Sequence, residues 1–419
     1  MQNIKYMKHL ITLFLLLITC IVQAQKLSLD AVLKEVQQQH PSVKMYDAEI
    51  QSMDEAAKGA RSWMAPEFAA GFYQTPYNVN QWKAGMNEPG MGMFMVSGQQ
   101  IFPNKKKQDA DAKYMEAMSS VVKEKKAATL NDLYAAAKSN YYDWMMIKKK
   151  IAVLQQNEGI LSFMIRNAEI RYQNGLEKVS AYYKAKAAMG NVENMKVMLE
   201  NEAVQKRIVL NTLMNRDKNI EFDIDSIYNI KAFPLENFDS VTIAASRSDI
   251  RSIDKDISVT YLQRDAERAK LKPEFGIRYD HMFAWAQQPW QFSLMGMIKI
   301  PMKWSTKMNY ATMESLKWKA ASLEQEKKMV INEATGMATG IRREMEVKEK
   351  QLQLFEHNII PALQKNFQTM QLGYEQNTEE LFMLYDAWET LNMTQLEYVE
   401  QLRQLLQLQV ELEKVLEKN

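Results

Sequence analysis

Among the side chains that can bind soft metal ions, methionines are by far the most numerous in this sequence. The chain has 30 methionines. Met91, Met93 and Met95 alternate along one stretch, as Met295 and Met297 do along another. Thioethers are soft ligands that suit Cu(I) and similar ions. Methionine is also a flexible apolar filler of protein interiors. The pattern therefore leaves a soft-metal role open beside the simpler explanation of packing.

The residue combinations of enzyme sites do not occur in the sequence. There is one cysteine, Cys20, and the three histidines beyond the first 24 residues, His40, His281 and His357, are far apart. No nucleophile with a nearby base, glycine-rich phosphate loop or cluster of metal ligands appears. The chain beyond residue 24 has as many basic as acidic residues, which gives no reason to expect nucleic acid. The sequence predicts neither an enzyme nor a bound cofactor.

Residues 1–24 have the pattern of a secretory signal peptide. Lys5 and Lys8 precede the apolar run 10–18. Val22-Gln23-Ala24 then has the pattern of a cleavage site, with a small residue at its end. The run is too short to span a membrane, which takes about 20 residues. We expect cleavage after Ala24. Lipidation of Cys20 is the alternative, although the residues before Cys20 fit a lipoprotein motif poorly.

The rest of the chain repeats itself with a period of about 200 residues. Asp47 matches Asp254, and Pro66-Glu67-Phe68 matches Pro273-Glu274-Phe275. A repeat of this length is too long for a solenoid unit of roughly 20–50 residues. It indicates a duplicated half-molecule, and therefore internal pseudo-symmetry.

Each half is predicted to run helix, strand, turn, strand, long helix, tip, return helix. We expect a first repeat at 25–216, a connector at 217–240 and a second repeat at 241–419. The strand hairpins are expected at about 67–100 and 274–300, the long helices at 104–173 and 305–376, and the return helices at 176–216 and 378–418. The long helices would extend about 100 Å at 1.5 Å per residue. Helices of that length without a globular core must pack side by side.

The strands alternate between polar and apolar residues over about ten positions, as membrane barrel strands do. One face carries Phe275, Ile277, Tyr279, Phe283, Phe292, Leu294, Ile298 and Ile300. The other carries the candidate pore-lining residues Glu274, Arg278, Asp280, Met282, Met295, Met297 and Lys299. The facing of Met91, Met93 and Met95 is ambiguous. Four strands cannot close a barrel, and open sheet edges are not tolerated in lipid. The sequence therefore predicts an oligomer, and three copies would supply twelve strands.

With these features the chain resembles the TolC family of outer-membrane efflux proteins. The resemblance rests on the duplicated halves, the two Pro-Glu-Phe motifs, and Arg171–Leu176 with its echo Gly373–Thr378. It implies a homotrimer with a twelve-stranded barrel in the outer membrane of a Gram-negative bacterium. A long α-helical barrel would cross the periplasm to a periplasmic adaptor (a membrane fusion protein) and an inner-membrane pump, expected to be of the RND type. Such a channel transports passively and does no chemistry.

The resemblance also assigns roles near the helical tips. Asn174, Gly175 and Leu176 match the first adaptor-binding tip of the family, and Gln376, Asn377 and Thr378 match the second. Asn377 stands where the family usually has glycine, and asparagine tolerates the left-handed conformation of such a turn. Tyr374 and Asp386 match periplasmic gate positions, and Met383 stands where a second gate aspartate often lies. An exposed helix face is the alternative explanation for Tyr374 and Asp386.

The cargo and one alternative architecture remain open at this stage. The methionine content is compatible with the CusC-like branch, whose partner pumps export copper and silver. Drugs, other small molecules and type I secretion substrates are alternatives. A periplasmic coiled-coil scaffold without a pore is the competing class. The lipid-type alternation in 274–300 argues against that class.

Overall fold

The computed structural model describes residues 26–86, 88, 90–231 and 239–418. The expected signal peptide, with Cys20 and the cleavage position, lies outside these residues, as does part of the connector. The chain divides into two compact units. The hairpin unit comprises Met1–Lys44, Ala127–Arg247 and Ile331–Asn419, and the sheet unit comprises Met45–Lys126 and Ser248–Val330. Each unit therefore takes equivalent parts of both repeats.

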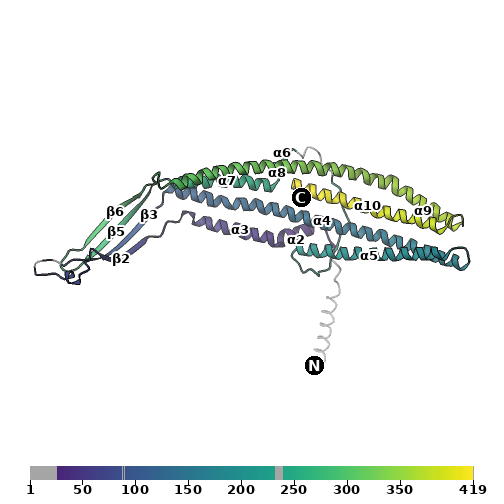
Figure 1. The fold of residues 1–419 in the computed structure, drawn as a ribbon, viewed down its shortest axis with the longest axis horizontal. Helices are drawn as coiled ribbons and strands as arrows, with labels where there is room; N and C mark the ends of the chain where they lie inside the picture. The colour runs from purple at the N-terminus through teal and green to yellow at the C-terminus, as the bar shows by residue number, and fades with distance from the viewer. Residues whose placement is uncertain (1–25, 87, 89, 232–238, 419) are drawn as a thin grey trace, which may run out of the picture. The chain divides into compact units, whose positions relative to one another are not determined.

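The sheet unit contains one antiparallel four-stranded sheet, in the order β2-β3-β5-β6 (Figure 1). The strands are β2 (Glu67–Tyr73), β3 (Met93–Phe102), β5 (Glu274–Ala284) and β6 (Gln291–Lys299). Both expected hairpins form, although β3 ends at Phe102, two residues beyond the expected end of the first hairpin. The central pair, β3 with β5, joins the two repeats. Within the described residues, the outer edges of β2 and β6 have no partner strand.

Equivalent ion pairs tie the helices of the sheet unit together in the two repeats. Helices α3 (Pro41–Lys58) and α7 (Ser248–Ala269) are the entry helices, and α4 (Lys105–Gln173) and α8 (Lys307–Leu354) are the long ones. Lys126 Nζ lies 2.5 Å from Asp47 Oδ1, and Lys327 Nζ lies 2.7 Å from Asp254 Oδ1. Asp47 and Asp254 are the residues matched by the repeat. The predicted pseudo-symmetry therefore extends to individual side-chain contacts.

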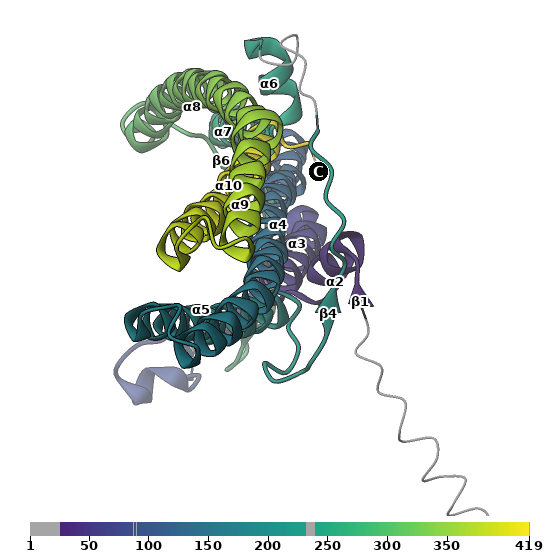
Figure 2. The ribbon, with the colours of Figure 1, turned by 90° about the vertical axis from the view of Figure 1, so that its right-hand side faces the viewer.

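The hairpin unit is built from antiparallel helices that meet at two tight turns. The C-terminal part of α4 turns into α5 (Val179–Leu213), and α9 (Ile360–Glu375) turns into α10 (Leu381–Leu416). Figure 2 shows these turn ends towards the viewer. The second long helix is interrupted by a π-helical turn, Phe355–Ile359. Pro361 lies two residues after the end of this turn. Because proline has no N–H and its ring clashes with the carbonyl four residues earlier, the wider turn accommodates it within the helix.

A continuous apolar seam packs these helices side by side. Helix α4 contributes Leu154, Leu161, Met164 and Ala168, α5 contributes Ala181, Ala188 and Val192, and α9 and α10 contribute Tyr374, Leu384 and Trp388. The small residues of α5 let its backbone come close to its neighbour. The indole Nε1 of Trp388 donates a buried hydrogen bond to Asn157 Oδ1 at 2.7 Å. Met164, fully buried here, acts as packing.

The start of the chain and the connector attach to the middle of α4. Strand β1 (Lys26–Leu27) pairs in parallel with β4 (Asp223–Ile224), and α2 (Leu29–Gln39) follows β1. The Tyr141 hydroxyl donates to Leu27 O at 3.1 Å, and Lys148 Nζ lies 2.6 Å from Asp223 Oδ1. The connector is non-helical over its described part until α6 (Ser240–Ser246). It therefore packs against α4 as part of the hairpin unit.

The described residues lack two features. No helix there has the length and apolarity needed to cross a membrane. No group of three or more His, Cys, Asp or Glu side chains in that part of the chain could hold a metal ion.

Candidate functional site

Strand register places all seven candidate pore-lining residues on one face of the sheet, called here the polar face. Residues that face each other across an antiparallel pair point to the same side. Glu274 faces Lys299, Arg278 faces Met295, and Met282 faces Gln291. Asp280 and Met297 follow by alternation along the same strands. The sheet therefore brings together residues that the sequence could only sort strand by strand. That this face lines a pore stays a prediction.

The register also resolves the ambiguous methionines. Met95 faces Met282, and Met93 faces Ala284. Both therefore belong to the polar face, while Phe94 and Val96 point to the opposite side. Met91 precedes the first residue of β3 and lies outside the sheet. Sequence alternation alone could not decide this, because both faces of β3 carry large apolar side chains.

Charges on the polar face are paired with one another or with Lys107 of α4. Glu274 lies 2.6 Å from Lys107 Nζ and 3.7 Å from Lys299 Nζ. Arg278 Nε donates to Asp280 Oδ1 at 2.9 Å, and Asp280 is buried. The face is thus polar without a strong net charge of one sign.

The opposite, apolar face of the sheet is largely exposed. Phe292, Leu294 and Phe275 are 71%, 67% and 57% exposed, and Ile298 beside them is 55% exposed. A contiguous exposed apolar surface of this kind marks a protein or membrane contact, because exposing it to water costs free energy. This face has the composition expected of the lipid side of a barrel wall.

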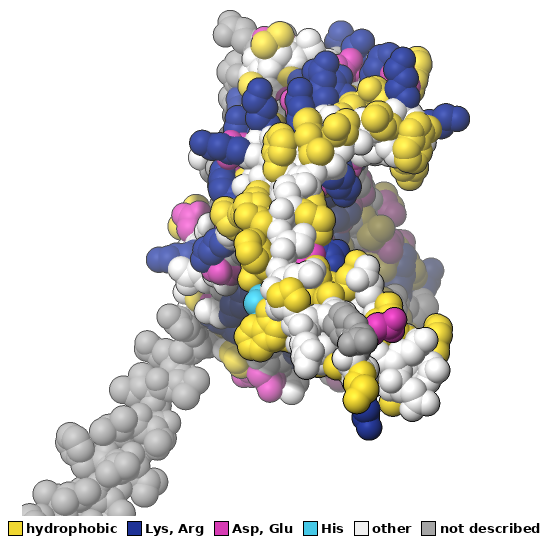
Figure 3. All heavy atoms as spheres, turned by 90° about the vertical axis from the view of Figure 1, so that its left-hand side faces the viewer, with side chains coloured by type: hydrophobic (Ala, Val, Ile, Leu, Met, Phe, Trp, Pro, Cys, Tyr) yellow, Lys and Arg dark blue, Asp and Glu magenta, His cyan; other side chains and the backbone are white. Residues whose placement is uncertain are grey.

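An aromatic cluster joins the two loops at the far end of the sheet. Phe72, Trp82 and Trp285 pack with ring centroids 5.7–6.2 Å apart. Gly90 N donates to Ala286 O at 3.2 Å, which ties the β2–β3 loop to the β5–β6 loop. Figure 3 views the molecule from this side, where hydrophobic side chains gather over the loops and strands. The loops therefore form one packed end instead of two free hairpins.

The two helical tips have the same backbone structure. Gly175 has a φ of 72° and Asn377 a φ of 59°, both left-handed. Leu176 N donates to Arg171 O at 2.8 Å, and Thr378 N donates to Gly373 O at 2.9 Å. These bonds close each helix in the same way, with one left-handed residue. Asn377 adopts the conformation predicted for it, so its replacement of glycine leaves the turn intact.

The structure brings the two predicted tips together at one hollow. Gly175 and Leu176 from the first turn and Asn377 and Thr378 from the second line a cavity of about 370 Å³. Charged residues frame it: Arg171, Glu177, Lys178, Glu379 and Glu380. Asn174 and Gln376 are exposed beside it. This is a concave, charged surface formed by both halves of the chain.

Arg171 is the residue that connects the two turns, and sequence reasoning gave it no role. Its Nη1 donates to Tyr374 O at 2.7 Å, and its guanidinium lies 4.4 Å from the centre of the Tyr374 ring. The only sequence signal was its place at the head of the repeated tip motif. Because it contacts the carbonyl and the ring at once, Arg171 holds the α9 turn against the end of α4.

The three candidate gate residues do not share one surface. Tyr374 is 1% exposed, and burial raises the pKa of its hydroxyl. Met383 is 51% exposed, and Asp386 is exposed on the same helix. Tyr374 therefore lies in the apolar seam and not on a solvated helix face. A role at the gate stays a prediction for Tyr374, Met383 and Asp386.

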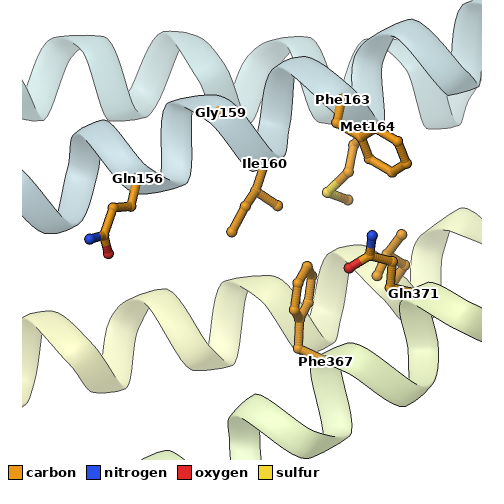
Figure 4. A pocket seen from close by; sticks show the side chains of 8 residues that line it. Gln156, Gly159, Ile160, Phe163, Met164, Phe367 and Gln371 are labelled. Atoms are coloured by element: carbon orange, nitrogen blue, oxygen red, sulfur yellow. The ribbon is translucent and has the colours of Figure 1, made fainter.

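A second hollow lies between α4 on one side and α9 and α10 on the other. It has a volume of about 300 Å³ and is lined by Gln156, Gly159, Ile160, Phe163, Met164, Phe367, Gln371 and Leu384. Figure 4 shows Phe367 and Gln371 facing Ile160 and Met164 across the gap. A Cβ added at Gly159 would meet nothing within 4 Å. The helices are thus less closely packed here than along the seam.

Comparison with known proteins agrees with this architecture. Residues 32–216 match the family model of the outer membrane efflux proteins. The fold is similar to that of the outer-membrane channel OprN (TM-score 0.76, 12% identity, 93% of this chain and 90% of that one). It is also similar to CusC (0.74, 12%, 93% and 91%) and to VceC from Vibrio cholerae (0.72, 14%, 93% and 95%). No curated protein sequence matches the chain.

Fold and sheet together define the class: a TolC-like fold, with long helical hairpins and four antiparallel strands per chain. The resemblance to the outer-membrane efflux family is confirmed. The family model matches the first repeat directly, and the fold is shared over 93% of the chain.

Proposed function

We propose that the protein is the outer-membrane duct of a tripartite efflux system. Substrates would be delivered by a periplasmic adaptor and an inner-membrane pump of the RND type, and would pass to the exterior without further chemistry. The observation that carries this proposal is the four-stranded sheet, with one exposed apolar face, one polar face and two unpaired edges.

The unpaired edges argue for a homotrimer. An unsatisfied backbone N–H or C=O in lipid costs several kcal/mol, so β2 and β6 must pair with other strands. Pairing β6 of one copy with β2 of the next removes every edge once the ring closes. Three copies supply twelve strands, an even number within the range of bacterial outer-membrane barrels. The polar face would then line the pore, and the apolar face would contact outer-membrane lipid.

The tips supply the proposed adaptor contact. Both turns are exposed, share one charged hollow and have rigid backbone closure, which lowers the entropic cost of docking. Met383 and Asp386, exposed on α10 just beyond the second turn, are the proposed constriction residues. A single aspartate per chain would make a weaker acidic ring than two.

The cargo is proposed on the composition of the polar face. Copper and silver ions are the first candidates, because methionines recur there. Drugs, other small molecules and type I secretion substrates remain alternatives, since OprN and VceC are as similar to this chain as CusC is.

Two arginine substitutions in neighbouring positions of β6 test the barrel assignment. Leu294 lies on the apolar face and Ser293 on the polar face, opposite Asp280. Arginine on the lipid side costs about 2–4 kcal/mol near the bilayer midplane, and much less inside the pore. We expect Leu294→Arg to lower the amount of trimer in outer-membrane fractions and Ser293→Arg to leave it near wild type.

Size and conductance of the full-length protein complete the test. The wild type, extracted from outer membranes in detergent, should be a trimer that conducts ions in planar bilayers. A water-soluble monomer without conductance would refute the proposal and favour the periplasmic scaffold. Equal insertion of both arginine variants would show that the apolar face does not meet lipid.

A further inference from the structure

We propose that Met93, Met95 and Met282 form a three-thioether site for a soft monovalent cation, Cu(I) or Ag(I), on the polar face of the sheet. As a site on the route of a transported ion it rests on the proposed channel function. As a binding site it needs only the fold of one chain.

The three side chains come from adjacent strands and point to the same side. Met95 directly faces Met282, so their Cβ atoms are about 4.5–5.5 Å apart. Met93 lies two residues before Met95, about 7 Å along β3, and is diagonal to Met282 at roughly 7–8 Å. Each side chain has three rotatable bonds, which lets the sulfur atoms converge. Three converging thioethers provide a low-coordinate soft-ligand set.

The surroundings leave room for an ion beside these sulfur atoms. Gly71 faces Met95 from β2, and a Cβ built there would meet nothing within 4 Å. Met93 is 7% exposed, and Met95 and Met282 are half-buried. Partial burial removes water from the thioethers while the empty position at Gly71 keeps one side open. An ion could therefore reach the sulfur atoms from the polar face.

The other methionines of the polar face lack this arrangement. Met295 faces Arg278, whose positive charge disfavours a cation, and Met297 faces Gly276. A Cβ added at Gly276 would lie 3.1 Å from the Met297 methyl carbon, so that side chain already covers the glycine. Met295 and Met297 are therefore a matched control pair on the same face.

Thioether binding has a distinctive pH behaviour. Cysteine and histidine must lose a proton to bind metal, whereas methionine has none to lose. Silver binding at this site should therefore hardly change between about pH 5 and pH 8. A histidine ligand, in contrast, binds a metal ion only in its neutral form, and His281 lies on the opposite, apolar face of the sheet, facing Phe292.

Silver titration of the purified full-length protein in chloride-free detergent buffer tests the site. We expect Met93→Leu/Met95→Leu/Met282→Leu to weaken Ag(I) binding by about tenfold or more, and Met295→Leu/Met297→Leu to leave it unchanged. Methyl signals of 13C-methionine should shift for the three site residues in the wild type. Leucine keeps nearly the same volume, and the single variant Met282→Leu serves if the triple variant does not fold.

Outcomes separate this inference from the channel proposal. Unchanged silver affinity in the triple or single variant, an equal loss in the control, or a steep fall in binding at low pH would overturn the thioether site. Potassium conductance is measured on the same samples. Conductance without silver binding would support the channel and refute the thioether site. Silver binding without conductance would support the site and refute the channel.

Discussion

Replacing the buried Lys138 by methionine should destabilise the hairpin unit more than the same replacement of an exposed, ion-paired lysine. Lys138, on α4, and Glu413, on α10, are 4% and 2% exposed, and their Nζ and Oε2 atoms lie 2.7 Å apart. The other oxygen of Glu413 lies 2.8 Å from Lys231 Nζ, in the connector. One buried carboxylate thus joins α4, α10 and the connector.

The magnitude follows from what the substitution leaves behind. Removing one partner of a buried ion pair typically costs about 3–5 kcal/mol, because a charge stays buried without compensation. Lys231 still faces Glu413 in the variant, although it is half exposed, so we expect about 2–3 kcal/mol. Glu413→Gln added to Lys138→Met removes the stranded charge. The double variant should therefore be less destabilised than the sum of the two single changes, with a coupling of about 1–3 kcal/mol.

Thermal unfolding of the purified protein, followed by circular dichroism at a fixed scan rate, measures this effect. In a chain of this size 1 kcal/mol shifts the midpoint by about 2 °C or less, so Lys138→Met should lower it by a few degrees. Lys317→Met is the control, because its pair with Glu314 is exposed and contributes only about 0–0.5 kcal/mol. If Lys138→Met behaves like Lys317→Met, the buried pair does not join these elements and the reasoning fails.

Two further predictions concern acid sensitivity and the tips. Hydrogen bonds from Arg403, and then from Lys150, lower the pKa of Glu400 from 4.5 to about 2. This stabilisation is present above about pH 4.5 and is lost as the pH falls towards 2. Glu400→Gln should therefore cost about 1 kcal/mol of stability at pH 7 after solvent screening, and it should flatten the fall in thermal midpoint between pH 5 and pH 2. An unchanged slope of midpoint against pH would contradict this prediction. At the tips, Gly175→Val places a branched side chain at a φ of 72° and should cost about 1–2 kcal/mol locally, whereas Asn377→Gly should be nearly neutral. Hydrogen exchange at the turn amides measures both, and equal protection in the two variants would show that the turns do not require left-handed residues.

Local patterns in the sequence were sufficient for the elements and their order. The spacing of apolar residues, the prolines and the turn at Asn174-Gly175 placed the helices and strands to within a few residues. Alternation along β5 and β6 also assigned their residues to the correct faces, because side-chain direction in a strand depends only on parity. The left-handed turn at Asn377 followed from the same local chemistry.

Contacts between distant segments were beyond the reach of these patterns. The pairing of β3 with β5 joins residues about 180 positions apart, and that register alone placed Met93 and Met95 beside Met282. Sequence matching could not show that Tyr374 is buried in the apolar seam among side chains of α4, α5 and α10. The π-helical turn before Pro361 arose because a long helix continues through proline only by local rewinding.

By itself, then, the sequence determined what depends on neighbours along the chain: two repeated halves, long helices, hairpins with one apolar face, and two matching tips. Tertiary structure decided which segments meet. It therefore decided the ion pair of Lys138 and Glu413, the contact of Arg171 with the carbonyl and ring of Tyr374, and the placement of Met93 and Met95 beside Met282 on the polar face. The physical reason is that helix and strand periodicity are local properties of the backbone. Burial and pairing, in contrast, depend on side chains that the folded chain brings together from far apart.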